Sequence, residues 1–337
     1  MLSLPALRAL RVHEPDAKLS VLSRPSVSEF YEACQEVDET IPYEPSDGLV
    51  AFSHTVRRLR ERELDLAVLF PNAFRCALMM YLARIPERWG YATDGRSLLL
   101  TRRVPPAPRP FGRHQIHFYL DCLRGLGVDP GNPSIELAPT PDMVSRAREL
   151  LIAHGWSVER PLVGVHPGST NSRAKRWLPE RFADVGRRFV DSHRAQVVLF
   201  GGADEASVTA SVGALLDGAD VVDLSAKTTL GELMGALSHL GLFVTNDSGP
   251  MHLAASLSVP TLAVFGPTDE RETGPFSSKA RIVREPVDCS PCLLRDCPID
   301  HRCMTRLESA HVYDRASDLL GELAQRETLA GSGEARN

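Results

Sequence analysis

The chain contains 337 residues, of which 43% are hydrophobic and 24% are charged, and it carries a net charge of −5. This length favours two domains, and the composition excludes a mainly disordered protein, which would be poorer in hydrophobic residues. The acidic balance argues against nucleic acid as a partner.

Membrane insertion and secretion are not indicated. The longest apolar region, 66–85, is broken by Pro71, Asn72, Arg75 and Arg84, so no segment reaches the roughly 18 apolar residues of a spanning helix. The first residues lack the basic leader and unbroken apolar core of a signal peptide. We therefore expect a cytoplasmic protein.

In the first half, short apolar runs alternate with segments of helical period, which predicts a parallel sheet covered by helices. Strands are predicted at 18–22, 66–70 and 87–91. Helices are predicted at 6–13, 27–37, 53–63, 74–83 and 114–125, the last preceded by a stiff proline-rich connection at 105–110.

The stretch from Arg57 to Arg113 is strongly basic. It holds twelve Arg and no Lys against five acidic residues, a charge of +7, so the remainder carries −12. Two interpretations stay open: ordinary solvated helix faces, or a surface that meets an anionic acceptor or an anionic membrane surface.

The second half shows a regular alternation of strands and helices, typical of a doubly wound sheet. Strands are predicted at 162–166, 196–200, 221–224, 242–245 and 261–265, and helices at 180–192, 204–216, 230–240 and 251–257. The segment 134–139, before a helix at 141–154, is interpreted as a hinge. We expect domains at 1–150 and 151–325, the second closed by a helix at 308–324, and a disordered Gly/Ser/Glu tail at 326–337.

The segment Asn246 to His252 follows a buried strand and has the features of an anion-binding turn. Gly249 lets a ligand approach the backbone, and Pro250 suits the first position of a helix, whose N–H groups and dipole favour a diphosphate. Asp247 is expected to contact sugar hydroxyls or a backbone amide. The alternative is an ordinary strand-to-helix turn capped by Ser248.

The segment 166–179 follows the first strand of the same half and also carries polar groups at a strand end. In a doubly wound sheet two such loops face one crevice. Ser169 and Thr170 can donate to phosphate oxygens, and Lys175 can stabilise a departing diphosphate. The alternative interpretation of Lys175, considered without its neighbours, is an ordinary surface lysine.

Several segments, in order and spacing, resemble the ADP-heptose:lipopolysaccharide heptosyltransferases of glycosyltransferase family 9, in particular the heptosyltransferase II branch. In the second half they are His-Pro-Gly-Ser (166–169), Ala-Lys-Arg-Trp-Leu-Pro (174–179), Val-Thr-Asn-Asp-Ser-Gly-Pro-Met-His (244–252) and Phe-Gly-Pro-Thr (265–268). In the first half they are 69–78, 85–91 and 114–120.

The resemblance implies an α/β protein of the GT-B fold, with two Rossmann-like doubly wound domains facing a cleft. The first domain would bind the lipopolysaccharide inner-core acceptor and the second ADP-heptose. Transfer would be inverting, with no metal or cofactor. Lys175 and Asp247 are the expected catalytic residues, and Asn72, Arg75 and Arg96 of the basic stretch are the expected acceptor contacts.

The expected donor-binding residues combine the two turns with positions carried over from the family. They are Ser169, Thr170, Lys175, Glu205, Thr228, Asp247, Ser248, Gly249, Pro250 and His252.

One departure from the family concerns the start of the chain. Family members open with a strand, a Gly-rich turn and an Asp that acts as base, followed by a helix resembling 2–10, and here Met1 falls inside that helix. We expect that the natural protein begins upstream and that the base precedes Met1. Alternatives are an ADP-sugar-binding pseudo-enzyme or a family member with another sugar or acceptor. A nicotinamide-dependent oxidoreductase is disfavoured, since no Gly-x-Gly-x-x-Gly follows a strand.

The seven cysteines form two groups. Cys34, Cys76 and Cys122 lie in apolar segments and are interpreted as small core residues. The others, Cys289, Cys292, Cys297 and Cys303, cluster near His301 with a spacing that could hold zinc. The resemblance implies no metal there, and a redox-sensitive or structural loop is the alternative.

Overall fold

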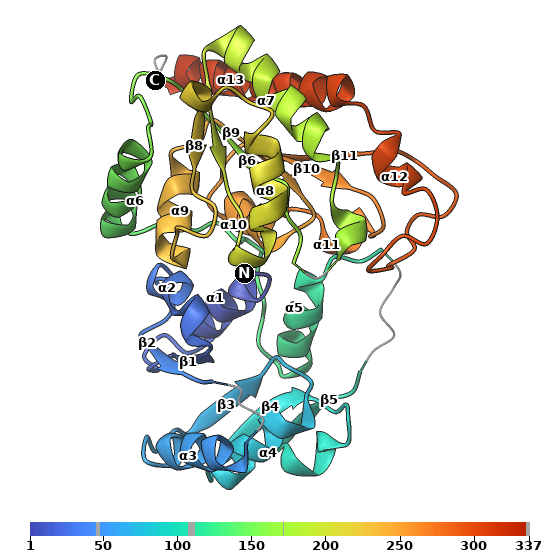
Figure 1. Cartoon of the computed structure of the whole chain (residues 1–337). Helices are drawn as coiled ribbons and strands as arrows, with labels where there is room; N and C mark the ends of the chain where they lie inside the picture. The colour runs from blue at the N-terminus through green and yellow to red at the C-terminus, as the bar shows by residue number, and fades with distance from the viewer. Residues whose placement is uncertain (45–47, 107–111, 171, 335–337) are drawn as a thin grey trace. The chain divides into compact units, whose positions relative to one another are not determined.

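A computed structural model describes residues 1–44, 48–106, 112–170 and 172–334 (Figure 1). It divides into two compact units, one of residues 2–134 and the other from Ile135 onward. The division lies earlier than the expected boundary at 150, so helix α6 (Pro141–Ala153) belongs to the second unit. The reason is its packing on α9 (Leu230–Ser238), where Gly235 has no side chain and a Cβ there would lie 2.2 Å from the carbonyl oxygen of Met143.

The second unit is built on one parallel sheet of six strands in the order β11-β10-β9-β6-β7-β8. This is the usual order of a doubly wound sheet, in which the chain reverses direction between its first and fourth strands, here β6 and β9. The strands are β6 (Leu162–His166), β7 (Gln196–Leu199), β8 (Val221–Asp223), β9 (Leu242–Asn246), β10 (Thr261–Phe265) and β11 (Ala280–Arg284). The doubly wound prediction is confirmed here, although β11 was not foreseen.

Helices cover both faces of this sheet, so every residue of β6, β9 and β10 is buried. On one face Val163 and Val165 of β6 join a core with Phe182 and Phe189 of α7. On the other, Met251 packs on strand β10. The helices are α7 (Pro179–His193), α8 (Ala206–Gly213), α10 (Gly249–Ser256), α11 (Glu270–Thr273), α12 (Arg302–Thr305) and α13 (Ser309–Glu334).

The C-terminal tail differs from the prediction. Helix α13 continues to Glu334, so 326–334 are helical, while 335–337 lie outside the described residues. Extending a helix that is already nucleated requires little additional free energy, because each added residue also adds a backbone hydrogen bond.

The first unit contains two small parallel sheets. Strands β1 (Ser20–Ser23) and β2 (Glu39–Pro42) form one, and β3 (Leu66–Leu69), β4 (Glu87–Tyr91) and β5 (Arg102–Val104) form the other. Among the described residues no strand joins β1 to β3, so the single doubly wound sheet expected for this half appears as two parts. Strands β2 and β5 were not predicted, because they are short and carry charged residues.

The helices of the first unit are close to their predicted positions. They are α1 (Leu4–His13), α2 (Ser28–Glu32), α3 (Leu49–Arg60), α4 (Phe74–Leu82) and α5 (Ile116–Gly125). Most of the proline-rich connection predicted at 105–110 lies outside the described residues. Within the described part of the chain, no helix is both long and apolar enough to cross a bilayer.

Candidate active site

A cavity of about 690 Å³ opens at the carboxyl ends of β6 and β9, where the strand order of the second unit reverses. Open α/β sheets bind ligands at this place. All ten residues expected to bind the donor line this cavity: Ser169, Thr170, Lys175, Glu205, Thr228, Asp247, Ser248, Gly249, Pro250 and His252. Their gathering in one cavity is a structural finding, and their contacts with a donor stay predictions.

The start of helix α10 forms one side of the cavity. Ser248 stands at its N-cap position, yet the Ser248 hydroxyl makes no capping hydrogen bond. A Cβ at Gly249 would meet no atom within 4 Å, so the backbone there is open to a ligand. The positive end of the helix dipole therefore faces a space that an anion can enter.

A lysine–aspartate ion pair stands at the same cavity. Lys175 Nζ lies 2.8 Å from Asp247 Oδ2, and the side chains are 26% and 5% exposed. The hydroxyl of Thr268 donates to the same oxygen of Asp247 at 2.7 Å. Asp247 thereby holds the ammonium group at the cavity, which is a positioning role that the sequence had not indicated. Thr268 was likewise missed, although it ends the Phe-Gly-Pro-Thr segment.

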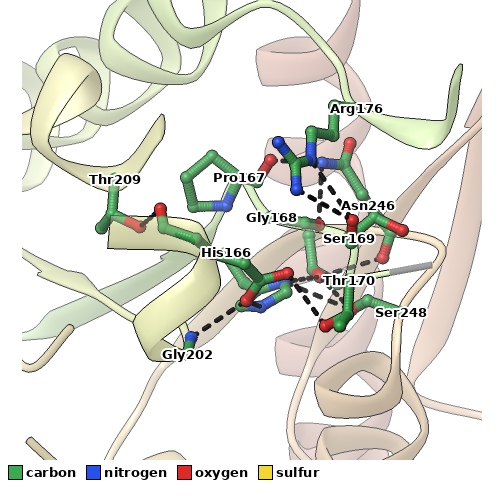
Figure 2. Close-up of polar contacts among 12 residues, drawn as sticks. His166, Pro167, Gly168, Ser169, Thr170, Arg176, Gly202, Thr209, Asn246 and Ser248 are labelled. Carbon is green, nitrogen blue, oxygen red and sulfur yellow. Dashed lines mark hydrogen bonds and ion pairs between the residues drawn. The ribbon is translucent and has the colours of Figure 1, made fainter. Parts of the chain in front are cut away.

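Asn246 joins the two loops that form the site. Its Oδ1 accepts a hydrogen bond from the backbone N–H of Trp177 at 3.0 Å, and its Nδ2 donates to the carbonyl of Pro167 at 2.8 Å. Arg176 donates to the carbonyl of Ser169 at 3.1 Å (Figure 2). Asn246 is fully buried. Its place at the end of a buried strand and in the segment 244–252 marked it as part of the turn, but not as the residue that joins the two loops.

Glu205 belongs to the cavity wall, but its carboxylate is already engaged by the protein. Oε2 lies 3.2 Å from His166 Nε2 and accepts from the N–H of Gly202 at 3.0 Å, and Oε1 accepts from Thr170 at 3.4 Å. Burial alone raises the pKa of Glu205, but the hydrogen bond and charge of His166 and the Gly202 N–H outweigh it, and the net pKa is lowered. His166 is the first residue of the His-Pro-Gly-Ser segment, and the sequence indicated no role for it.

The start of helix α9 forms a further wall of the cavity, which is more apolar. Helix α9 starts there with a capping box, in which Thr229 Oγ1 accepts from the Glu232 N–H at 3.2 Å and the Glu232 carboxylate accepts from the Thr229 N–H at 2.8 Å. Leu230 and Leu233 follow in the first turn and line the cavity, as does Phe200. Such residues are indistinguishable from core residues in a sequence.

The expected acceptor residues lie in the first unit, and one of them is corrected. Arg96 is fully buried, with Nε donating to the Tyr91 carbonyl at 2.8 Å and Nη2 to Asn72 Oδ1 at 3.0 Å. In this position its guanidinium supports the loop after β3 rather than a ligand. Arg75 lies over the ring of Phe52 at 5.1 Å. Acceptor binding by Asn72 and Arg75 stays a prediction.

Much of the charge in the basic stretch is engaged within the protein. Arg57 pairs with Glu61 at 2.8 Å, and Arg113 pairs with Asp121. Arg102 stacks on the ring of Trp89 at 4.4 Å. These contacts account for part of the arginine content, and contact with the inner membrane stays a prediction.

Three of the clustered cysteines, Cys289, Cys292 and Cys297, lie on an irregular segment that contacts the cavity loops, and Cys303 lies on α12. The N–H of Cys292 donates to the Pro267 carbonyl at 3.0 Å. Among the residues described, no three side chains of His, Cys, Asp or Glu come together as a metal-binding group. Cys289 and Cys292 are exposed and Cys303 is buried.

We expect alkylation to separate these thiols. Burial, helped by the other cysteines nearby, raises the pKa of Cys303 to about 11, so little thiolate forms at neutral pH. Iodoacetamide at pH about 8, followed by peptide mass spectrometry of the native protein, should modify Cys289 and Cys292 and leave Cys303 unmodified. Equal labelling of all three would contradict this arrangement, and equal labelling after unfolding is the control.

Comparison with known proteins places this geometry in a family. A model of glycosyltransferase family 9 (heptosyltransferase) matches residues 53–302. The lipopolysaccharide heptosyltransferase 2 of Salmonella typhimurium is 30% identical over 298 residues, 84% of each chain. The lipooligosaccharide heptosyltransferase 2 of Campylobacter jejuni is 28% identical over 264 residues, 77% of this chain and 76% of that protein.

Solved structures agree. An E. coli ADP-heptose lipopolysaccharide heptosyltransferase II matches with a TM-score of 0.81 and 26% identity, covering 96% of this chain and 95% of that chain. A glycosyltransferase of family 9 from Veillonella parvula matches in fold, with a TM-score of 0.84 at 22% identity, over 95% of this chain and 93% of that one. The α/β fold of the GT-B class is thus confirmed. The chain belongs to glycosyltransferase family 9, the heptosyltransferases.

Proposed function

We propose that this chain transfers a heptose from ADP-heptose to the inner core of lipopolysaccharide. The names of its relatives support the sugar and the acceptor, and that of the E. coli structure supports the donor. The observation that carries the proposal is the meeting of Lys175 and the start of α10 at one cavity. Together they would surround a diphosphate with positive charge.

The proposed reaction is a single inverting displacement. An acceptor hydroxyl attacks the anomeric carbon, the bond from that carbon to the ADP oxygen breaks, and the hydroxyl proton passes to solvent water. Lys175 and the dipole of α10 stabilise the charge that develops on the leaving diphosphate. Because these groups supply the positive charge, we propose that transfer needs no metal ion. Leu230 and Leu233 offer an apolar surface to the nucleoside.

On the acceptor side, we assign Asn72 and Arg75 to contacts with the lipopolysaccharide core, and the stretch Arg57–Arg113 to peripheral contact with the inner membrane. Sedimentation with vesicles of anionic and of neutral lipid checks the second assignment. Binding to the anionic vesicles that weakens with salt supports it, and equal binding to both contradicts it.

The direct test is a transfer assay. The purified chain is incubated with ADP-heptose and with lipopolysaccharides truncated at successive core positions, with and without EDTA. We expect ADP release and a mass gain of one heptose on one of the acceptors, unchanged by EDTA, and NMR should show an inverted anomeric centre. UDP-glucose and ADP-glucose serve as donor controls. No preference for ADP-heptose would contradict the donor assignment, and binding without transfer would favour the pseudo-enzyme.

A further inference from the structure

His166 lies on the cavity wall within a chain of polar groups, and Figure 2 shows it beside Ser248. Its Nε2 is 3.2 Å from Glu205 Oε2 and its Nδ1 is 3.3 Å from Ser248 Oγ. The His166 and Glu205 side chains are only 3% and 5% exposed. None of the contacts assigned above to the leaving diphosphate uses this histidine.

The Glu205 side determines which ring nitrogen of His166 carries hydrogen. Burial raises the pKa of Glu205, but the contacts with His166 and the Gly202 N–H lower it by a larger amount. The net pKa lies below the usual value, so the carboxylate is the ionised form. An ionised carboxylate can only accept hydrogen bonds. Nε2 of His166 must therefore carry a hydrogen and donate it to Glu205.

On the other side of the ring, few hydroxyl hydrogens are available. Thr245 Oγ1 lies 3.0 Å from the carbonyl of Asn246 and 3.5 Å from His166 Nδ1, and its hydrogen goes to the nearer carbonyl. Toward Ser248, at 3.2 Å, Thr245 Oγ1 is therefore an acceptor. A neutral His166 also presents an acceptor, Nδ1, to Ser248. The Ser248 hydrogen is then directed to Nδ1 or Thr245 and away from the cavity.

A second proton on the ring reverses this arrangement. Nδ1–H then donates to Ser248 Oγ, and the hydrogen of Ser248 is released to point at a ligand oxygen. Ser248 stands at the N-cap of α10 without capping it, so its hydroxyl is available for this purpose. The charged ring would lie between the Glu205 carboxylate and the ligand.

We infer that binding of the ADP-sugar is coupled to uptake of one proton by His166, which positions the Ser248 hydroxyl to donate to a diphosphate oxygen. The proton comes from solvent and resides on Nδ1, while Nε2 keeps its hydrogen on Glu205. This inference rests on the proposed function, since only an anionic ligand favours the charged ring. His166 is a positioning residue and takes no part in bond breaking.

Other charged or titratable groups surround the same place. They are Lys175 and Asp247, which pair with each other, Arg176, whose charge acts on Glu205, and His252 on α10. His252 is the second imidazole that lines the cavity. H252Q therefore tests whether this second imidazole takes the proton, and H311Q, at an exposed histidine of α13 that does not line the cavity, is the matched control.

The test is isothermal titration calorimetry of the full chain with ADP-heptose, without acceptor, in buffers of different ionisation enthalpy at pH about 8, where an ordinary imidazole is neutral. ADP-heptose is preferred to ADP because its diphosphate has no terminal phosphate that ionises near neutral pH. The dependence of the observed enthalpy on the buffer gives the number of protons taken up. We expect the wild-type chain to take up about one proton for each ADP-heptose bound.

Variants identify the residue that takes up the proton. H166Q should bind ADP-heptose about tenfold more weakly and without proton uptake. E205Q should show reduced uptake, H252Q should keep the uptake, and H311Q should keep both the affinity and the uptake. Circular dichroism checks that each variant is folded. The wild-type measurement tests the inference even if a variant does not fold. Binding without uptake by the wild type, or loss of uptake in H252Q with retention in H166Q, overturns the inference and leaves the donor site standing. Absence of ADP-heptose binding overturns both.

Discussion

Replacement of Lys175 by methionine is expected to lower kcat for heptose transfer by about 100- to 1,000-fold, the usual loss when one group that stabilises transition-state charge is removed. Lys175 Nζ is held at the cavity by Asp247 at 2.8 Å and remains 26% exposed, so it is both positioned and accessible. Methionine keeps the length of the side chain and removes the charge. The decrease should be larger in kcat than in the affinity for ADP-heptose, because the leaving diphosphate carries more charge than the bound donor.

The matched control for this variant is K18M. Lys18 also forms an ion pair, with Glu39 at 2.6 Å, but its side chain is 69% exposed and it lies in the other unit. Transfer by K18M should stay within about twofold of the wild type, as for most exposed ion pairs. K175R should retain part of the activity. If K175M raised KM alone, Lys175 would bind the donor without assisting departure of ADP.

A second large effect is expected at the contact between α6 and α9. In G235A the new methyl group would lie 2.2 Å from the Met143 carbonyl oxygen and 2.7 Å from the Cβ of Ala147. The helices have to separate, and overpacking of this kind lowers the free energy of unfolding by about 1–3 kcal/mol. The gain in helix propensity from alanine, about 1 kcal/mol, opposes this only in part. Urea unfolding followed by circular dichroism measures the difference.

Gly321 provides the matched control, because it also lies inside a helix. A Cβ at Gly321 meets no atom within 4 Å, so G321A should raise the free energy of unfolding by about 0.5–1 kcal/mol. The two glycine-to-alanine changes should therefore have opposite signs. Stabilisation by both would show that α6 and α9 separate without cost and would contradict the close packing.

The same helix contact explains why the domain boundary was misplaced. Helix α6 was predicted correctly as a helix, but whether it packs with the first or the second unit depends on Gly235, far along the chain. Hydrophobic periodicity indicates that a helix has a buried face, and it carries no information about what covers that face.

The gathering of the expected donor residues in one cavity was predictable because these residues lie in short segments at strand ends. A parallel sheet brings all carboxyl ends of its strands to one edge, so two polar turns that follow neighbouring strands must meet. The loops 166–179 and 246–252 met as expected, and every expected donor residue lines their cavity. Assignment to the family followed from the same segments.

The burial of Arg96 could not be predicted in this way. An arginine in a basic stretch reads as a ligand contact, but this one is fully buried and donates to Tyr91 and Asn72. Burial of a charged side chain depends on the carbonyls and loops folded around it, and none of these is visible from its neighbours in the sequence.

By itself, the sequence determined the parallel α/β class, the doubly wound second half and the position of the cavity proposed to hold the donor, because strand periodicity and strand-end turns are local signals. Only the tertiary structure decided which side chains contact one another. Asp247 pairs with Lys175 and accepts a hydrogen bond from Thr268, Asn246 joins two loops, and Glu205 contacts His166. These partners are separated by tens of residues, and hydrogen bonds between buried groups form only where folding has brought donor and acceptor within about 3 Å of each other.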